Sequence, residues 1–154
     1  MGLREEEMNN IEKAIEIVNK YYYRPINCKI YKNQVELLKA ESRDNGYPYK
    51  YLVKYYREYI LANKTEYIED VYNNDPKATD TIAAICGDPI KINSYFYSMD
   101  TDDWIITLLH EMAHNYYFEK SNGETYGGEH ECDLYAIRWA KKIKKIQRKL
   151  QEEK

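Results

Sequence analysis

Hydrophobic positions recur every three or four residues over several long stretches, the spacing of helices with one buried face. Four long helices are expected, over residues 5–22, from Pro48 to near Asn63, from Thr101 or Asp102 as N-cap to before Asn122, and over residues 129–151. The last helix carries an apolar stripe of Cys132, Tyr135, Ala136, Trp139, Ile143, Ile146 and Leu150. Shorter helical turns are expected over residues 35–40 and 67–71.

Alternating and β-branched patterns predict three short strands. They cover residues 26–31, 81–86 and 90–97, and the last two are joined by a tight turn at Gly87-Asp88-Pro89. No repeat or low-complexity linker divides the chain. We therefore predict one α+β domain over residues 1–154, with a helical part over about 1–75 and a second part over about 76–154. A small, mostly antiparallel sheet would pack on the two last helices.

Composition excludes several classes of protein. The 154 residues are 44% hydrophobic and 32% charged, with a net charge of −3, which is typical of a folded domain with no general attraction to nucleic acid or anionic membrane. No apolar run is long enough to span a bilayer, and the acidic N-terminus lacks the apolar core of a signal peptide. The cysteines number three and form no CxxC pair, which favours a reducing compartment. We expect a cytoplasmic protein without membrane partners.

One motif carries chemistry. His110-Glu111-Met112-Ala113-His114 has the form HExxH and lies in the middle of a predicted helix. Residues i and i+4 share a helix face, so both imidazoles can bind one Zn²⁺, while Glu111 can act as general base. The alternative is a surface helix that happens to carry two histidines.

The next helix begins with candidates for a third ligand. All three histidines of the chain lie within residues 110–130, and Glu129 precedes His130 directly. Adjacent helical residues point about 100° apart, so only one of the two would face the metal. Asp133 shares a helix face with Glu129 and would accept the outer ring N–H of a ligand histidine. The alternative is a solvated acidic first turn that the helix dipole favours.

Two sequence motifs resemble those of a known family. The segments TLLHEMAH (107–114) and EHECDLYA (129–136) are similar to the gluzincin pattern HExxH…ExxxD, and more narrowly to ImmA/IrrE-type metallopeptidases. The resemblance covers about residues 80–140 and includes the strand Ile90-Lys91-Ile92-Asn93. It implies a zincin-like fold with His110, His114 and Glu129 as zinc ligands.

The chain departs from this family in two ways. Cys132 replaces the usual Ala, and fourteen residues separate His114 from Glu129, a short gap. A short gap after LLHEMAH also resembles SprT-like proteases, which act on DNA-associated proteins and in which a histidine is the third ligand. That resemblance implies His130 as the ligand. We expect Glu129, because Asp133 and the Tyr-Ala pair accompany it.

These observations predict a zinc metallopeptidase that cleaves a protein or peptide substrate. Glu111 would transfer protons, Tyr126 and His130 are candidates to stabilise the oxyanion, and the strand over residues 90–97 would pair with an extended peptide as an edge strand. Cys132 is expected to pack as a small hydrophobic side chain. The ImmA/IrrE resemblance implies a regulatory protease or antirepressor. A non-catalytic module in which zinc staples two helices is a further alternative.

The C-terminal segment is strongly basic. Residues 138–154 contain eight basic side chains and two acids. Such a segment is either a solvated helix face or a patch that contacts phosphates. A nucleic-acid partner therefore stays open, and the sequence does not indicate an oligomeric state.

Overall fold

A computed structural model describes residues 2–62, 82–96 and 99–153. The chain forms two compact units that alternate along the sequence. Unit 1 comprises Met1–Lys29, Ala84–Lys91 and Phe96–Lys154, and unit 2 comprises Ile30–Ala83 and Ile92–Tyr95. These boundaries do not follow the division near residue 75 expected from sequence. The short helix predicted over residues 67–71 lies outside the described residues.

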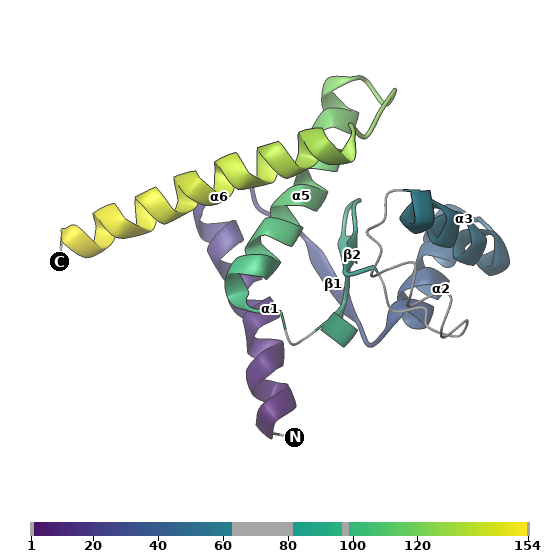
Figure 1. The fold of residues 1–154 in the computed structure, drawn as a ribbon, viewed down its shortest axis with the longest axis horizontal. Helices are drawn as coiled ribbons and strands as arrows, with labels where there is room; N and C mark the ends of the chain where they lie inside the picture. Colours follow the sequence, from purple (N-terminus) through teal and green to yellow (C-terminus); the bar gives the residue numbers. More distant parts are fainter. Residues whose placement is uncertain (1, 63–81, 97–98, 154) are drawn as a thin grey trace. The chain divides into compact units, whose positions relative to one another are not determined.

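Unit 1 is built from three long helices. They are α1 (Gly2–Tyr21), α5 (Thr101–Lys120) and α6 (Glu129–Glu152), and α5 packs against both of the others (Figure 1). The core between them contains Val18, Trp104 and Leu108, which are fully buried. The helical periodicity of the sequence therefore predicted these three helices.

The start of α5 differs from the sequence prediction. Asp100, and neither Thr101 nor Asp102, is the N-cap, because its side chain accepts a hydrogen bond from the backbone N–H of Asp103 at 2.8 Å. Its backbone is extended, as a cap requires. The helix ends before Asn122 and Gly123, both at positive φ, as expected.

Unit 2 contains helices α2 (Gln34–Asn45) and α3 (Tyr49–Ala62). Helix α2 is longer than the predicted turn or two, because Asn33 caps its N-terminus and Gly46, at φ 76°, ends it. Two buried amides hold Ile82 in this unit: Gln34 Oε1 accepts its N–H at 2.8 Å, and Asn93 Nδ2 donates to its carbonyl at 2.9 Å.

The sheet has three strands in the order β1-β3-β2. They are β1 (Cys28–Tyr31), β2 (Ala84–Ile85) and β3 (Ile90–Asn93), and the sheet is mixed rather than mostly antiparallel. The protein is α+β, as predicted.

Strand β3 corrects the predictions for residues 90–97. The strand ends at Asn93, where the side-chain oxygen accepts the N–H of Tyr95 at 3.0 Å and a 3-10 helix covers Ser94–Phe96. Because β3 is the central strand and all its residues are buried, both its edges are occupied. The prediction that it pairs as an edge strand with a substrate peptide is therefore wrong.

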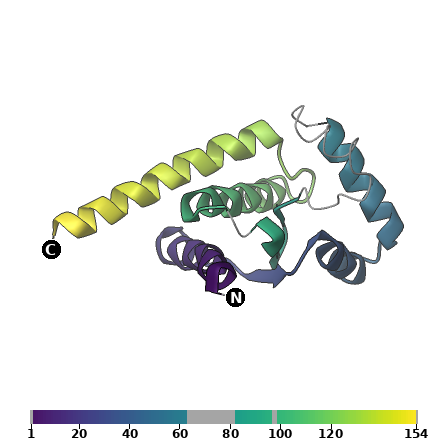
Figure 2. The ribbon, with the colours of Figure 1, turned by 60° about the horizontal axis from the view of Figure 1, so that its bottom comes forward.

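Helix α6 buries only part of its predicted stripe. Cys132, Tyr135 and Ile143 are buried, whereas Ile146 is 39% and Leu150 42% exposed. The C-terminal part of α6 extends beyond α5, and no described element of unit 1 covers it (Figures 1 and 2). Among the described helices, none is long and apolar enough to cross a membrane.

Candidate metal centre

The Nε2 atoms of two histidines on α5 lie close to each other. His110 and His114 are four residues apart on the helix, and their Nε2 atoms lie 3.2 Å from each other. The two rings are nearly perpendicular, with centroids 4.8 Å apart. This arrangement follows from the HExxH spacing, which places both side chains on one helix face.

The carboxylate of Glu129 contacts both histidines. Its Oε2 lies 2.8 Å from His110 Nε2, and its Oε1 lies 3.2 Å from His114 Nε2. Glu129 is the first residue of α6, where the positive end of the helix dipole favours a carboxylate. One acidic and two imidazole side chains, from two helices, therefore present their ligand atoms to one another.

The outer ring nitrogen of each histidine also has an acceptor. Asp133 Oδ1 lies 2.8 Å from His110 Nδ1, and the backbone carbonyl of Tyr126 lies 2.8 Å from His114 Nδ1. When these Nδ1 atoms carry the ring hydrogen, they donate to the two oxygens and the Nε2 lone pairs are left for a metal. The geometry thus orients both rings as metal-binding histidines are usually oriented.

The loop between α5 and α6 fixes the Tyr126 carbonyl. The Tyr126 ring stacks on Phe118 at a centroid distance of 4.3 Å, and the hydroxyl of Ser121 bonds with the backbone of Thr125. Gly127 has a φ of 77°, and a Cβ there would lie 2.7 Å from the ring of Tyr117. Only glycine fits this position, and its conformation sets the direction of the preceding carbonyl.

Glu111 is buried beside the histidines. Its ligand atom lies within 4.8 Å of theirs, and its Oε2 has no hydrogen-bond partner among the described residues. Burial raises the pKa of this carboxyl to about 7, although positive charge on His110 and His114 would lower it. A buried carboxyl with an unpaired oxygen costs stability.

The histidines hold protons tightly while no metal is bound. Burial lowers the pKa of His110, but the hydrogen bond to Glu129 and the charges of Glu111, Glu129 and Asp133 outweigh it and raise the pKa to about 9. The pKa of His114 is raised as well, against burial, chiefly by its bond to Glu129. A divalent cation among these acids would take the place of those protons.

The structure separates the predicted site residues into two sets. It brings together His110, Glu111, His114, Glu129 and Asp133. His130 is exposed, and it lies outside this group among the described residues. The backbone carbonyl of Tyr126 contacts His114 Nδ1. A role of the Tyr126 hydroxyl or of His130 at an oxyanion stays a prediction.

Sequence reasoning missed two contacts of His114. One is the backbone carbonyl of Tyr126. Because every residue type has a backbone carbonyl, the sequence indicated this contact only through the glycine that follows Tyr126. The other is Cys132, whose Sγ lies 3.3 Å from His114 Nδ1. Cys132 is fully buried, as expected of a packed side chain, and burial first, then nearby carboxylates, raise the pKa of its thiol to about 12. In the metal-free protein it is therefore a neutral thiol.

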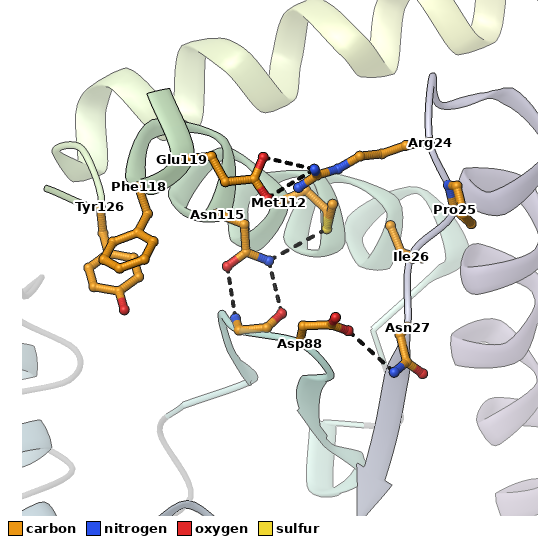
Figure 3. A pocket seen from close by; sticks show the side chains of 11 residues that line it. Arg24, Pro25, Ile26, Asn27, Asp88, Met112, Asn115, Phe118, Glu119 and Tyr126 are labelled. Atoms are coloured by element: carbon orange, nitrogen blue, oxygen red, sulfur yellow. Dashed lines mark hydrogen bonds and ion pairs between the residues drawn. The ribbon is translucent and has the colours of Figure 1, made fainter. Parts of the chain in front are cut away.

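A cavity of about 590 Å³ lies along the flank of α5 (Figure 3). Two sets of interactions join its lining residues. One guanidinium nitrogen of Arg24 donates to both carboxylate oxygens of Glu119, at 2.9 and 3.1 Å, and the side-chain amide of Asn115 bonds with both the N–H and the carbonyl of Gly87. The remaining lining residues are Pro25, Ile26, Asn27, Asp88, Met112, Phe118 and Tyr126. The cavity therefore shares the Tyr126 loop with the histidine group and is partly polar and partly apolar.

Comparison with protein-family models, with curated proteins and with solved structures found no match to this chain. Its function has to be inferred from the geometry of the site itself.

Proposed function

We propose that the protein is a zinc-dependent metallopeptidase. The observation that carries this proposal is the contact of one carboxylate, that of Glu129, with the Nε2 atoms of both His110 and His114. Two imidazoles and a carboxylate are a ligand set that catalytic zinc uses, with the fourth position left for water or substrate.

The side chains present fit that metal. The three ligand atoms are already close together, and both rings are oriented through their outer nitrogens by Asp133 and the Tyr126 carbonyl. Zinc bound there would supply a water molecule of lowered pKa and polarise the scissile carbonyl. A structural zinc site would need a fourth protein ligand, and the neighbouring thiol of Cys132 instead faces the outer nitrogen of His114.

The chain's own residues would carry the proton transfers. Glu111 is buried, has one oxygen without a hydrogen-bond partner in the described part of the chain, and has a pKa raised to about 7 in the metal-free protein. It would accept a proton from the attacking water and deliver it to the leaving amine. The cavity along α5, whose lining includes Tyr126 and Met112, would hold substrate side chains, in place of the strand pairing expected from sequence.

The narrower interpretations follow from the resemblances. The resemblance to ImmA/IrrE-type metallopeptidases, in which Glu129 would be a zinc ligand, implies a protein substrate and a regulatory or antirepressor role. The SprT-like reading requires His130 at the metal, and the contacts of Glu129 with both histidines favour the first. A zinc-stapled, non-catalytic module would have no use for a buried, unpaired Glu111.

Zinc-loaded wild type and Glu111→Gln, compared on a mixed library of quenched fluorescent peptides, test the proposal. We expect the variant to keep one zinc and lose hydrolysis by about 10²–10⁴-fold, as for removal of a general base. Glu124→Gln, an exposed acid in the same unit, is the matched control and should cleave normally. Equal activity of Glu111→Gln would place the base elsewhere, and a fully loaded but inactive wild type would favour the zinc-stapled module.

A further inference from the structure

The outer face of α6 carries a row of cations. On a helix of 100° per residue, Arg138, Lys142, Lys145 and Lys149 fall within about 60° of one another and extend over about 16 Å. All four side chains are exposed. We call these four residues the basic row.

The charge of this segment is one-sided. Residues 134–151 contain seven cations and no acid, in a chain whose net charge is −3. The acids of α6 lie at its two ends, Glu129, Glu131 and Asp133 at one and Glu152 and Glu153 at the other. Of the seven cations, Lys144 forms an ion pair among the described residues, with Asp102 at 3.3 Å. Lys144 does not belong to the basic row. No ion pair is therefore recorded for the row among the side chains that the structure describes.

A pocket lies at the N-terminal end of the row. It has a volume of about 230 Å³ between α5 and α6 and is lined by three cations, Lys120, Arg138 and Lys142. Its other described lining residues are aromatic, with no carboxylate among them. The ammonium of Lys142 lies 4.5 Å from the centre of the Trp139 ring, and that of Lys120 lies 5.6 Å from the centre of the Tyr116 ring. Cation–π contacts thus hold two of the cations at this pocket.

We propose that the basic row and this pocket bind the phosphate backbone of nucleic acid. One phosphate would occupy the pocket, and the following phosphates would meet Lys145 and Lys149 along the helix. A single small anion would use the pocket alone, whereas cations repeated over about 16 Å match a linear polyanion.

The apolar side of α6 argues against a membrane as the partner. A helix that lies in a bilayer surface needs a broad free apolar face. Here Tyr135, Ala136 and Ile143 are buried against the rest of unit 1. Four large apolar side chains of α6 are exposed, but at 100° per residue Leu134 and Ile137 lie apart from the stripe that Ile146 and Leu150 continue, so they form no single broad face. The proposal uses no residue of the histidine group and does not rest on the peptidase assignment.

Fluorescence anisotropy of a fluorescein-labelled, 20-base-pair DNA duplex of mixed sequence, titrated with the full chain from 50 to 300 mM KCl, tests this. We expect binding that weakens with salt and differs by less than about twofold between two unrelated sequences, because backbone contacts carry no sequence information. Each phosphate contact contributes about 0.9 to the slope of log K against log salt.

The variant Lys142→Gln/Lys145→Gln/Lys149→Gln should bind at least about tenfold more weakly at 100 mM KCl, and its salt slope should fall by about three. Lys13→Gln/Lys39→Gln/Lys50→Gln removes the same charge at exposed sites elsewhere and should bind like wild type. Arginine at the three row positions should preserve binding, which separates loss of charge from loss of fold.

Three results would overturn the proposal. They are no binding of wild type at 50 mM KCl, equal weakening in the row variant and the control, or binding to phosphatidylserine vesicles without binding to the duplex. The last result would assign the row to a membrane surface.

Discussion

Removing the charge of Glu111 should stabilise the metal-free protein at neutral and alkaline pH. The ordinary pKa of this carboxyl is 4.5, and burial raises it to about 7 in the folded chain. Below about pH 4.5 the group is protonated in both the folded and the unfolded state and has no effect on their balance. Above pH 7 folding must bury a carboxylate, which costs about 3 kcal/mol for this difference in pKa. Glu111→Gln keeps the shape of the neutral side chain and avoids that cost.

Thermal unfolding in the presence of a chelator, from pH 5 to pH 8.5, measures the difference. Wild type and Glu111→Gln should unfold at similar temperatures near pH 5. By pH 8.5 the Tm of the variant should exceed that of wild type by about 6–12 °C, since about 1 kcal/mol shifts Tm by 2–4 °C at this chain length. Glu124→Gln, at an exposed position, should show no such gap. A gap that is constant with pH, or a variant less stable than wild type at pH 8.5, would refute a buried, unpaired carboxylate at this position.

Two further predictions concern zinc ligation and the loop that supports it. Zinc affinity of three variants is compared by equilibrium dialysis at one pH. Glu129→Ala should lose zinc affinity sharply and Asp133→Ala by about 10–100-fold, while His130→Ala should keep its zinc. If His130→Ala lost its zinc and Glu129→Ala kept it, the ligand assignment would be reversed. Gly127→Ala should lose about 1–3 kcal/mol in urea unfolding and bind zinc more weakly, because its methyl would overlap a neighbouring ring at a positive φ. Gly46→Ala has nearly the same φ and open space around it, so it should lose less and leave zinc affinity unchanged; equal losses would contradict a tight fit at Gly127.

Helical spacing explains how much of the site could be predicted. The 3.6-residue period located α5 and α6, and it placed His110 with His114 and Glu129 with Asp133 on shared faces. Both pairs depend on intervals of four residues within one helix, which a sequence displays directly. The contact of Glu129 with both histidines is a contact between helices, and the prediction of that ligand relied on the resemblance.

Features that depend on what lies next to an element were harder to predict. Alternation at residues 90–97 indicated a strand but carried no information on strand order, so the central position of β3 was missed. Periodicity likewise extended the apolar stripe of α6 to Ile146 and Leu150, although both side chains are exposed in the part of the chain that the structure describes. The carbonyl of Tyr126 could not be found from residue types, because every residue carries one.

The central claim is a metal centre with three protein ligands and one open position. A crystal structure of the zinc-loaded protein, with anomalous diffraction measured on both sides of the zinc absorption edge, tests it most directly. We expect one zinc bound by Nε2 of His110, Nε2 of His114 and a carboxylate oxygen of Glu129, with a solvent molecule as the remaining ligand and Glu111 beside that molecule. Zinc held by four protein side chains, or zinc bound away from these histidines, would contradict it.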